Sequence, residues 1–272
     1  MRVATIGGGI IARLVLDQLA RGGIADAQAV CIMGRSASAR ARTLASEHGV
    51  PFATTVAQLL AQSPDVVVEA ASHDAVRDYG VSLLQAGVTL IVLSAGALCD
   101  DALRVRLERA AREHDALLYV PSGGIGGLDA LKAACIAGVD EVSITVSKPP
   151  AAWKNIPYVE SLGVALDVLT EPRTLYEGPA RAGVPLFPAN VNIAAVLALS
   201  GIGFDATRLK VVADPRITHN THRIEIRGRS GNIRVELENV PAPENPKTAW
   251  LACYSALAAL QLSRRGGVRY GT

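Results

Sequence analysis

The chain has 272 residues, half of them hydrophobic, with 27 Lys and Arg against 25 Asp and Glu and a net charge of +2. This composition can bury a substantial core, and the length suits two modest domains. Because charges of both signs are spread along the chain, the sequence excludes the basic stripe of a nucleic-acid-binding protein and favours a small charged metabolite as the partner.

The N-terminus and the cysteines predict a cytoplasmic protein without a membrane partner. Met1 leads directly into an expected strand and a glycine turn, which leaves no room for the apolar segment of a signal peptide. No run of about 18 uninterrupted apolar residues predicts a membrane span. Cys31, Cys99, Cys135 and Cys253 lie far apart, with no C-x-x-C pair and no Cys/His cluster at metal-ligand spacing. We therefore expect buried thiols in a reducing cytosol and no bound metal.

Residues 2 to 120 alternate short β-branched runs with longer amphipathic runs rich in Ala and Leu. This alternation is typical of βαβ units and predicts an α/β domain with a doubly wound parallel sheet, a Rossmann fold. The expected strands are Val3–Ile6, Ala29–Met33, Val66–Ala70, Thr89–Leu93 and Leu117–Val120. The expected helices are Ile10–Arg21, Ala37–His48, Ala75–Gln85 and Asp101–His114, the last one behind Asp100 as its N-cap.

The pattern changes after about residue 138, where longer strands with alternating polar and apolar residues predict a C-terminal α+β domain with a mostly antiparallel sheet. Its expected strands are Glu141–Ser147, Leu209–Ala213, Thr221–Arg227 and Asn232–Glu238, and its expected helix is Leu128–Ala137. A last helix at Ala249–Ser263 is expected to return to the first domain. The predicted domains are therefore residues 1–121 with the C-terminal helix at about 246–272, and residues 122–245.

A glycine-rich turn follows the first expected strand. The segment Gly7-Gly8-Gly9-Ile10-Ile11-Ala12 fits G-x-G-x-x-A between a strand and a helix, with a second strand about 20 residues further on. Glycines allow close approach of the backbone, so a pyrophosphate can lie on the N–H groups and the positive dipole end of the helix. We expect a dinucleotide here, contacted by Gly7, Gly9, Ile10 and Ile11. A turn needed only for packing is the alternative.

The second expected strand ends in Met33-Gly34-Arg35-Ser36. Domains that prefer NAD usually have an acidic residue at this point, which binds the ribose 2′-hydroxyl. Without that carboxylate nothing repels a 2′-phosphate, and Arg35 with Ser36 could bind one. We therefore expect NADP to be accepted, alone or beside NAD. The alternative for Arg35 is an ordinary solvated arginine.

Small residues follow two central strands, as a bound cofactor requires, since bulk there would fill the crevice. Ala71 and Ser72 follow one strand, and Ser94 and Ala95 follow the next. We expect these four residues to line the ribose and the nicotinamide. The glycine-rich segment 121–127, at the expected domain border, would supply a hinge, a nicotinamide contact or both.

Two histidines lie close together in one expected strand region. If the strand begins at Asn220, its period of two places Asn220, His222, Ile224 and Ile226 on one face. His222 then points with Asn220 into a protected site, and His219 lies on the other side.

Several segments together carry a family resemblance. They are the Gly7–Ala12 turn, Glu69-Ala70-Ala71-Ser72, Leu93–Leu98, Pro121–Ala130, Ser147-Lys148-Pro149-Pro150, Phe187–Asn192, Asp214-Pro215 with Asn220-x-His222, and Glu238-Asn239 with Asn245-Pro246-Lys247-Thr248. With these segments the chain resembles the L-aspartate dehydrogenases over nearly its whole length.

The resemblance implies a homodimer of subunits with a Rossmann domain and an α+β catalytic and dimerisation domain. It implies oxidation of L-aspartate by NAD or NADP to iminoaspartate, which hydrolyses to oxaloacetate and ammonia or feeds NAD biosynthesis. By the same resemblance His222 is the catalytic histidine, and Asn192, with Asn190 as the close alternate, contacts the nicotinamide end. The loop from Gly124 to Gly126 touches the cofactor.

The chemistry of this reaction suits these residue types. Hydride leaves the Cα atom, so a base must keep the amine neutral and must later activate water against the imine, and a histidine can do both. The two substrate carboxylates need cations, and Lys148 and Lys247 are the candidates, with Asn220 as a further substrate contact. A structural role is the alternative for each lysine.

Two other readings remain open. One is a different two-domain reductase of a small acid, of the dihydrodipicolinate or homoserine type. The other is a non-catalytic dinucleotide sensor, which would bind the cofactor tightly without turnover. The Asn220-x-His222 pair argues against a sensor, and a panel of amino acids with both cofactors would separate the enzymes.

Overall fold

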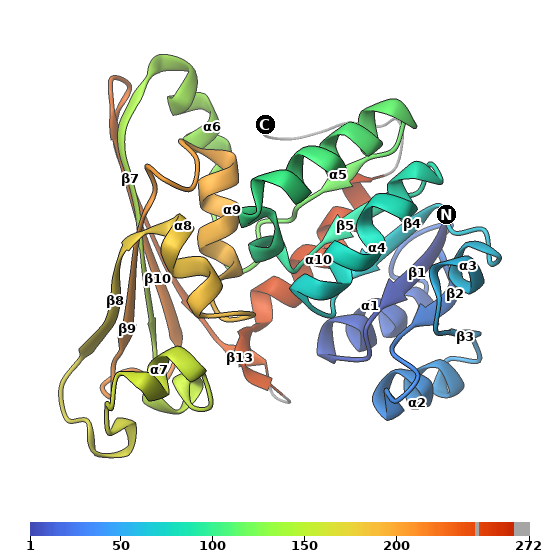
Figure 1. Cartoon of the computed structure of the whole chain (residues 1–272), viewed down its shortest axis with the longest axis horizontal. Coiled ribbons are helices and arrows are strands. Elements are labelled where there is room, and N and C mark those ends of the chain that lie inside the picture. The colour runs from blue at the N-terminus through green and yellow to red at the C-terminus, as the bar shows by residue number, and fades with distance from the viewer. Residues whose placement is uncertain (243–244, 264–272) are drawn as a thin grey trace. The chain divides into compact units, whose positions relative to one another are not determined.

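The computed structural model describes residues 1–242 and 245–263, apart from the side chains of residues 245–247. The chain divides into two compact units (Figure 1). The first contains Met1–Pro121 and the C-terminal segment that begins at Cys253, and the second contains Ser122–Ala252. Within the described residues, no helix is both long enough and apolar enough to cross a bilayer.

The first unit is built on a six-stranded sheet with the order β3-β2-β1-β4-β5-β6. Its strands are all parallel: β1 (Arg2–Ile6), β2 (Gln28–Met33), β3 (Phe52–Ala53), β4 (Val66–Glu69), β5 (Thr89–Val92) and β6 (Leu118–Tyr119). The order reverses beside β1, which is the topology of dinucleotide-binding domains. The predicted parallel α/β fold is confirmed. The sequence does not predict β3, because two residues at a sheet edge show no periodicity.

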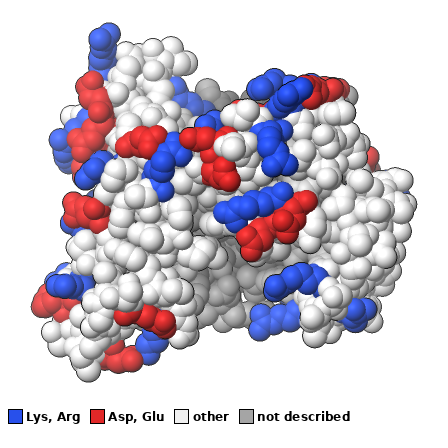
Figure 2. Space-filling model, in the orientation of Figure 1, with Lys and Arg blue, Asp and Glu red and all other residues white. Residues whose placement is uncertain are grey.

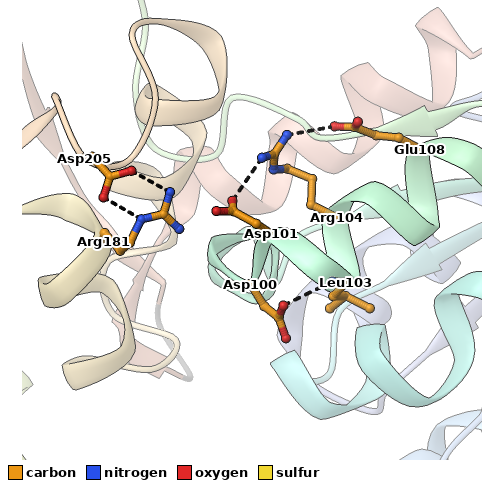
Figure 3. A network of polar contacts seen from close by, with 7 residues as sticks. All are labelled: Asp100, Asp101, Leu103, Arg104, Glu108, Arg181 and Asp205. Carbon is orange, nitrogen blue, oxygen red and sulfur yellow. Dashed lines mark hydrogen bonds and ion pairs between the residues drawn. The ribbon is translucent and has the colours of Figure 1, made fainter.

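Helices connect these strands: α1 (Ile10–Ala20), α2 (Ala39–Glu47), α3 (Val56–Leu60), α4 (His73–Gln85) and α5 (Asp101–Glu113), with the C-terminal α10 (Trp250–Leu262). Asp100 caps α5 as predicted, because its carboxylate accepts a hydrogen bond from the main-chain nitrogen of Leu103 at 3.1 Å (Figure 3). The expected start of α4 at Ala75 is wrong. Ser72 caps this helix by accepting a hydrogen bond from the nitrogen of Ala75 at 3.3 Å, so α4 begins at His73.

Two buried clusters hold the first unit together. One joins α1 and α10 to the central strands through Val3, Val15, Leu19, Ile24, Val66, Val68, Ile91, Ala256, Ala259 and Leu260. The other joins α1 to α2 and β2 through Ala12, Leu16, Ile32, Ala41, Leu44 and Ala45. Strands buried on both faces are continuous apolar runs, which explains why β4 shows no alternation. The C-terminal helix therefore belongs to the core of the N-terminal unit.

The second unit contains a five-stranded sheet with the order β11-β10-β7-β9-β8. Its strands are β7 (Val139–Lys148), β8 (Arg173–Pro179), β9 (Arg208–Ala213), β10 (Asn220–Gly228) and β11 (Gly231–Asn239), and a separate pair is formed by β12 (Pro241–Ala242) and β13 (Asn245–Ala249). All neighbours in the five-stranded sheet are antiparallel except β7 and β9. The predicted mostly antiparallel sheet is confirmed. The edge strand β8 is not predicted, because its exposed sequence shows no regular alternation.

The helices of the second unit are α6 (Leu128–Ala137), α7 (Pro157–Ser161), α8 (Ala180–Gly183) and α9 (Asn192–Ser200). The helix α9 is buried over most of its length, and α6 contacts both α9 and β10. The predicted face of β10 is confirmed, since Asn220, His222, Ile224 and Ile226 are all buried. The alternation of β10 thus brings a histidine and an asparagine into the interior of this unit.

Several charged side chains on the surface are paired with neighbours of opposite sign. In the first unit Arg104 bonds to both Asp101 and Glu108, and in the second Arg181 binds Asp205 through two hydrogen bonds of 2.6 and 2.7 Å (Figure 3). Basic and acidic residues are interspersed over the face drawn in Figure 2, with no continuous basic patch among the described residues there. Such exposed pairs each contribute little stability, because solvent and salt screen them.

The four cysteines are free thiols, but the expectation that all are buried is only half right. Cys31 and Cys253 are buried, whereas Cys99 and Cys135 are partly exposed. Burial raises the pKa of each of the two buried thiols to about 11, which keeps them protonated and unreactive near neutral pH.

Candidate active site

The turn between β1 and α1 has a shape that only glycine permits. Gly7 has a φ of +111°, and a Cβ atom added there would lie 2.6 Å from the main-chain oxygen of Ala70. A Cβ atom on Gly8 would lie 2.4 Å from the nitrogen of Ala41. Gly9 is the N-cap of α1, and no side chain in the described part of the chain caps this helix. The N–H groups of its first turn therefore fit the pyrophosphate of a dinucleotide.

The other residues predicted to contact the cofactor follow three strands of the same sheet. Arg35 is exposed after β2, and Ala71 and Ser72 are exposed after β4. Ser94 and Ala95 are buried after β5. Because the strands are parallel, their carboxyl ends lie along one edge together with the glycine turn, where such sheets bind their ligands. The fold therefore brings these residues to one edge of the first unit.

A buried carboxylate, which the sequence patterns do not single out, organises two of these loops. Glu69 is the last residue of β4 and is 1% exposed. Its carboxylate accepts hydrogen bonds from the nitrogens of Ala71 at 2.8 Å and Ser72 at 3.0 Å. It also accepts from the nitrogen of Ser94 at 3.0 Å and from its Oγ at 2.9 Å. Glu69 thus ties the loop after β4 to the loop after β5.

The environment of Glu69 acts on its pKa in two directions. Burial raises the pKa of this carboxyl above its ordinary value, and the hydrogen bonds from Ala71, Ser94 and Ser72 oppose that rise. A signal for Glu69 exists in the sequence, because it is a lone acidic residue directly after three valines. An acidic residue in that position is expected only where hydrogen-bond donors compensate its burial.

In the second unit, His222 lies on β10 with 2% of its surface exposed. Its Nδ1 atom is 2.9 Å from the main-chain oxygen of Gly124. Asn239, at the end of β11, donates a hydrogen bond from Nδ2 to the same oxygen at 2.9 Å. A carbonyl oxygen can only accept, so the Nδ1 atom of His222 carries a hydrogen and donates it. In neutral His222 the Nε2 atom therefore has the free lone pair and is the basic nitrogen.

The Nε2 atom of His222 is buried and has no hydrogen-bond partner within the residues described. Burial lowers the pKa of His222 from 6.5 to about 4, and the positive charge of Lys148 lowers it further, while the bond to Gly124 opposes the change. The imidazole is therefore neutral at neutral pH. A buried neutral histidine with an unbonded Nε2 is suited to take a proton from a ligand.

Lys148 is a buried cation at the end of β7, 3% exposed. Its Nζ atom donates a hydrogen bond to the main-chain oxygen of Asn190 at 3.1 Å and lies 5.4 Å from the ring centre of Trp153. The strands β7 and β10 are paired, with Val146 opposite His222 and Ser147 opposite Thr221. This register places the end of β7 beside the start of β10, so the lysine lies near the histidine in the sheet.

Two buried asparagines in this unit have unsatisfied side-chain atoms. Neither Oδ1 nor Nδ2 of Asn220 has a hydrogen-bond partner in the described structure, and Asn220 is fully buried. The Oδ1 atom of Asn190 is also buried without a hydrogen-bond partner among the described residues. Buried polar atoms are nearly always hydrogen-bonded in folded proteins, so a cluster of unbonded ones indicates a polar ligand. Asn220 lies two residues before His222 on the same strand face, so its unbonded amide and the unbonded Nε2 atom of His222 share one face of β10.

Four further residues that the sequence analysis considered also lie in the second unit. Asn192 is the half-buried first residue of α9, and Gly126 is half-buried beside Leu237 of β11. Lys247 lies in β13, and its side chain is outside the described part of the chain. His219 is exposed just before β10, as predicted. Like Glu69 in the first unit, Asn239 in the second is a residue that the sequence patterns did not identify, although it stands in one of the segments that carry the resemblance.

A parallel sheet with a glycine turn at its central strand, joined to an α+β unit with a buried neutral histidine, defines a two-domain NAD(P)-dependent oxidoreductase. Residues 7–121 match the family described as homoserine dehydrogenase, NAD binding domain, and residues 129–263 match aspartate dehydrogenase, C-terminal. The first match covers the unit with the glycine turn, and the second covers the unit with the histidine.

Similarity to individual proteins shows to which family the chain belongs. The chain is 44% identical to L-aspartate dehydrogenase 2 of Bordetella bronchiseptica over 266 residues, 96% of both chains. It is 43% identical to L-aspartate dehydrogenase of Methanosarcina barkeri over 211 residues, 78% of both. The crystal structure of aspartate dehydrogenase from Thermotoga maritima superposes with a TM-score of 0.75 at 28% identity, covering 100% of this chain and 99% of that one. The chain belongs to the L-aspartate dehydrogenase family.

Proposed function

We propose that this chain catalyses the reversible NAD(P)-dependent oxidation of L-aspartate to iminoaspartate, which hydrolyses to oxaloacetate and ammonia. The observation that carries the proposal is the unbonded Nε2 atom of buried His222, on the same strand face as the unsatisfied side chain of Asn220. An amine oxidation needs a neutral base next to polar groups that hold the substrate. Membership of the family supports aspartate as the substrate.

His222 acts as the general base in this proposal. With Nδ1 donating to Gly124, Nε2 removes a proton from the substrate ammonium group, so that the amine lone pair can support loss of hydride from Cα. NAD(P), held by the glycine turn of the first unit, would supply the hydride acceptor. His222 then releases the proton of the ammonium group to solvent, which its low pKa favours, and the freed Nε2 atom takes a proton from the water that attacks the imine carbon. Its low pKa keeps it unprotonated before each of these steps.

The substrate is a dianion, and we propose that cations and amides of the second unit hold its carboxylates. Lys148 supplies a buried ammonium group, and Asn220 supplies an amide with donor and acceptor atoms that no described residue uses. Asn190 holds Lys148 through its main-chain oxygen. Lys247 remains the candidate for the second carboxylate on sequence grounds alone.

In the first unit, we propose that the glycine turn binds the pyrophosphate and that Arg35 binds a 2′-phosphate when the cofactor is NADP. The exposed position of Arg35 after β2 and the absence of an acidic residue there in the sequence support this assignment. Ala71, Ser72, Ser94 and Ala95 line the ribose and nicotinamide. The family resemblance assigns Gly124, Gly126, Asn190 and Asn192 of the second unit to the nicotinamide end.

We also propose that the protein is a cytoplasmic homodimer, with the second unit as the dimerisation domain. The four free thiols suit a reducing compartment, and dimerisation rests on the family resemblance. Sedimentation of the purified protein at several concentrations measures the subunit number. A monomer at every concentration would contradict the dimer and leave the reaction untouched.

The deciding experiment follows NAD(P)H formation with L-aspartate at alkaline pH, beside a panel of other amino acids and homoserine. We expect L-aspartate to give the highest kcat/KM by far. Turnover with homoserine or another acid in its place would assign a different two-domain reductase. Tight cofactor binding without turnover on any panel member would indicate a dinucleotide sensor.

A further inference from the structure

The Gly124 oxygen that receives the hydrogen of His222 is shared with Asn239. Asn239 is 5% exposed at the end of β11, where it pairs in register with Asn220 of β10. Its Nδ2 atom lies 2.9 Å from the Gly124 oxygen and 3.1 Å from the Nδ1 atom of His222. A loop and the two strands of one hairpin, 98 and 115 residues further along the chain, therefore meet at one carbonyl group.

The orientations of the two side chains follow from this shared acceptor. If the amide of Asn239 were turned over, its Oδ1 atom would face the Gly124 oxygen, and two acceptors would oppose one another. If the Nδ1 atom of His222 carried no hydrogen, its lone pair would face the same oxygen at 2.9 Å. Both nitrogens therefore point hydrogens at one carbonyl, whose two lone pairs accept them. Their 3.1 Å separation results from sharing that acceptor.

We propose that Asn239 is a positioning residue for His222. Its amide holds the Gly124 carbonyl in the place where that carbonyl selects the Nδ1–H form of the imidazole and leaves Nε2 as the base. Without Asn239 only the imidazole itself holds the carbonyl, and either neutral form of the ring becomes accessible. Asn239 touches no reacting atom and acts only through Gly124 and His222. The catalytic consequence rests on the proposed role of His222, but the selection of the tautomer does not.

The close packing around Gly124 is consistent with this role of Asn239. A Cβ atom on Gly124 would lie 3.0 Å from the Cβ atom of Ala249, 3.4 Å from Cε1 of His222 and 3.6 Å from Nδ2 of Asn239. The three partners therefore pack closely around Gly124, so a small shift of this loop moves the acceptor relative to the imidazole. A hydrogen bond from Asn239 to the carbonyl restrains that shift.

The test uses the full-length protein with 15N-labelled histidine and observes the ring nitrogens of His222 by NMR near neutral pH, without substrate. The signal of His222 is assigned by its loss in His222→Gln. In the wild type we expect hydrogen on Nδ1 and a free lone pair on Nε2. In Asn239→Leu, which keeps the shape but removes the amide, we expect a mixture of tautomers or hydrogen on Nε2. Asn232→Leu, an exposed asparagine on the same strand, is the matched control.

Kinetics on the same variants separate positioning from a structural role. We expect Asn239→Leu to lower kcat by about 10-fold or more, with KM for aspartate and cofactor affinity nearly unchanged, because only the proton-transfer steps are affected. Hydrogen on Nε2 in the wild type would overturn the proposal whether or not any variant folds. An unchanged Nδ1–H tautomer in folded Asn239→Leu would also overturn it. If aspartate is not turned over but the tautomer changes as expected, the positioning role stands and the proposed reaction fails.

Discussion

The Nδ1 atom of His222 lies 2.9 Å from the main-chain oxygen of Gly124, which stands 98 residues earlier in the chain. This hydrogen bond determines which nitrogen of the imidazole carries a hydrogen and which one is basic. The proposed reaction therefore depends on a loop carbonyl as much as on the histidine itself.

Replacing His222 with Ala is expected to lower kcat by about 10²- to 10⁴-fold, the usual range for loss of a positioned general base. Cofactor affinity should hardly change, because the pyrophosphate and ribose contacts are assigned to the first unit. His219→Ala is the control, since His219 is exposed just before β10, and this variant should keep most of the activity. Steady-state kinetics and cofactor titration measure both variants. A fully active, folded His222→Ala enzyme would disprove the mechanism.

His222 should also make stability depend on pH. Its pKa in the folded protein is about 4, below the value of 6.5 expected in the unfolded chain. Between these values the unfolded state binds more protons, so the free energy of unfolding falls as pH decreases from about 6.5 to about 4. The loss from this group alone reaches about 3 kcal/mol.

Urea unfolding at several pH values measures this effect. The difference between wild type and His222→Gln isolates the histidine from the carboxyl groups that titrate in the same range. We expect the stability of the wild type relative to His222→Gln to fall with decreasing pH in this window. A difference that stays constant with pH would show that His222 is not buried in its neutral form.

Glu69→Gln is expected to weaken both the first unit and its cofactor site. The side chain of Gln has one acceptor oxygen and a donor amide, so it cannot accept all four hydrogen bonds from Ala71, Ser72 and Ser94. We expect a loss of about 1–3 kcal/mol in stability and about 10-fold in cofactor affinity. Thermal unfolding and cofactor titration provide the measurements. Glu113→Gln, an exposed residue of the same unit, is the control, and equal behaviour of the two variants would exclude a special role for Glu69.

Arg35→Ala is expected to weaken NADP binding by about 1–3 kcal/mol and to leave NAD binding nearly unchanged, because only NADP has the 2′-phosphate. Arg21→Ala, at the C-terminal end of α1 and therefore far from the glycine turn along that helix, should affect neither cofactor. Titration of both variants with both reduced cofactors gives the answer. Equal losses for NAD and NADP in Arg35→Ala would count against a phosphate contact.

Lys148→Met is expected to raise KM for aspartate much more than KM for the cofactor, because the buried ammonium group is lost and the length of the side chain is kept. Lys210→Met is the matched control, since Lys210 lies on the neighbouring strand β9 and pairs with Glu177. The substitution also removes the hydrogen bond that Lys148 donates to the main-chain oxygen of Asn190. Circular dichroism must therefore show that the variant is folded. An unchanged KM for aspartate would transfer the carboxylate contact to another cation, such as Arg216 or Arg223.

The sequence alone determined the features that depend on neighbouring residues. The alternation of strand and helix patterns predicted the parallel sheet, and the glycine turn predicted the dinucleotide site. The period of two in β10 placed His222 and Asn220 inside and His219 outside, and the structure confirms these positions. Such features can be predicted because backbone geometry repeats over a few residues and burial follows that repeat.

Only the tertiary structure decided which distant residues meet. The carbonyl of Gly124 receives hydrogen bonds from residues 98 and 115 positions later, and Glu69 accepts from Ser94 on another loop, 25 positions away. The parallel pairing of β7 with β9 and the presence of β8 likewise depend on the path of the chain. These contacts follow from strand order and register, which side-chain periodicity does not specify. A buried polar group finds its partner only when the complete fold excludes water from both.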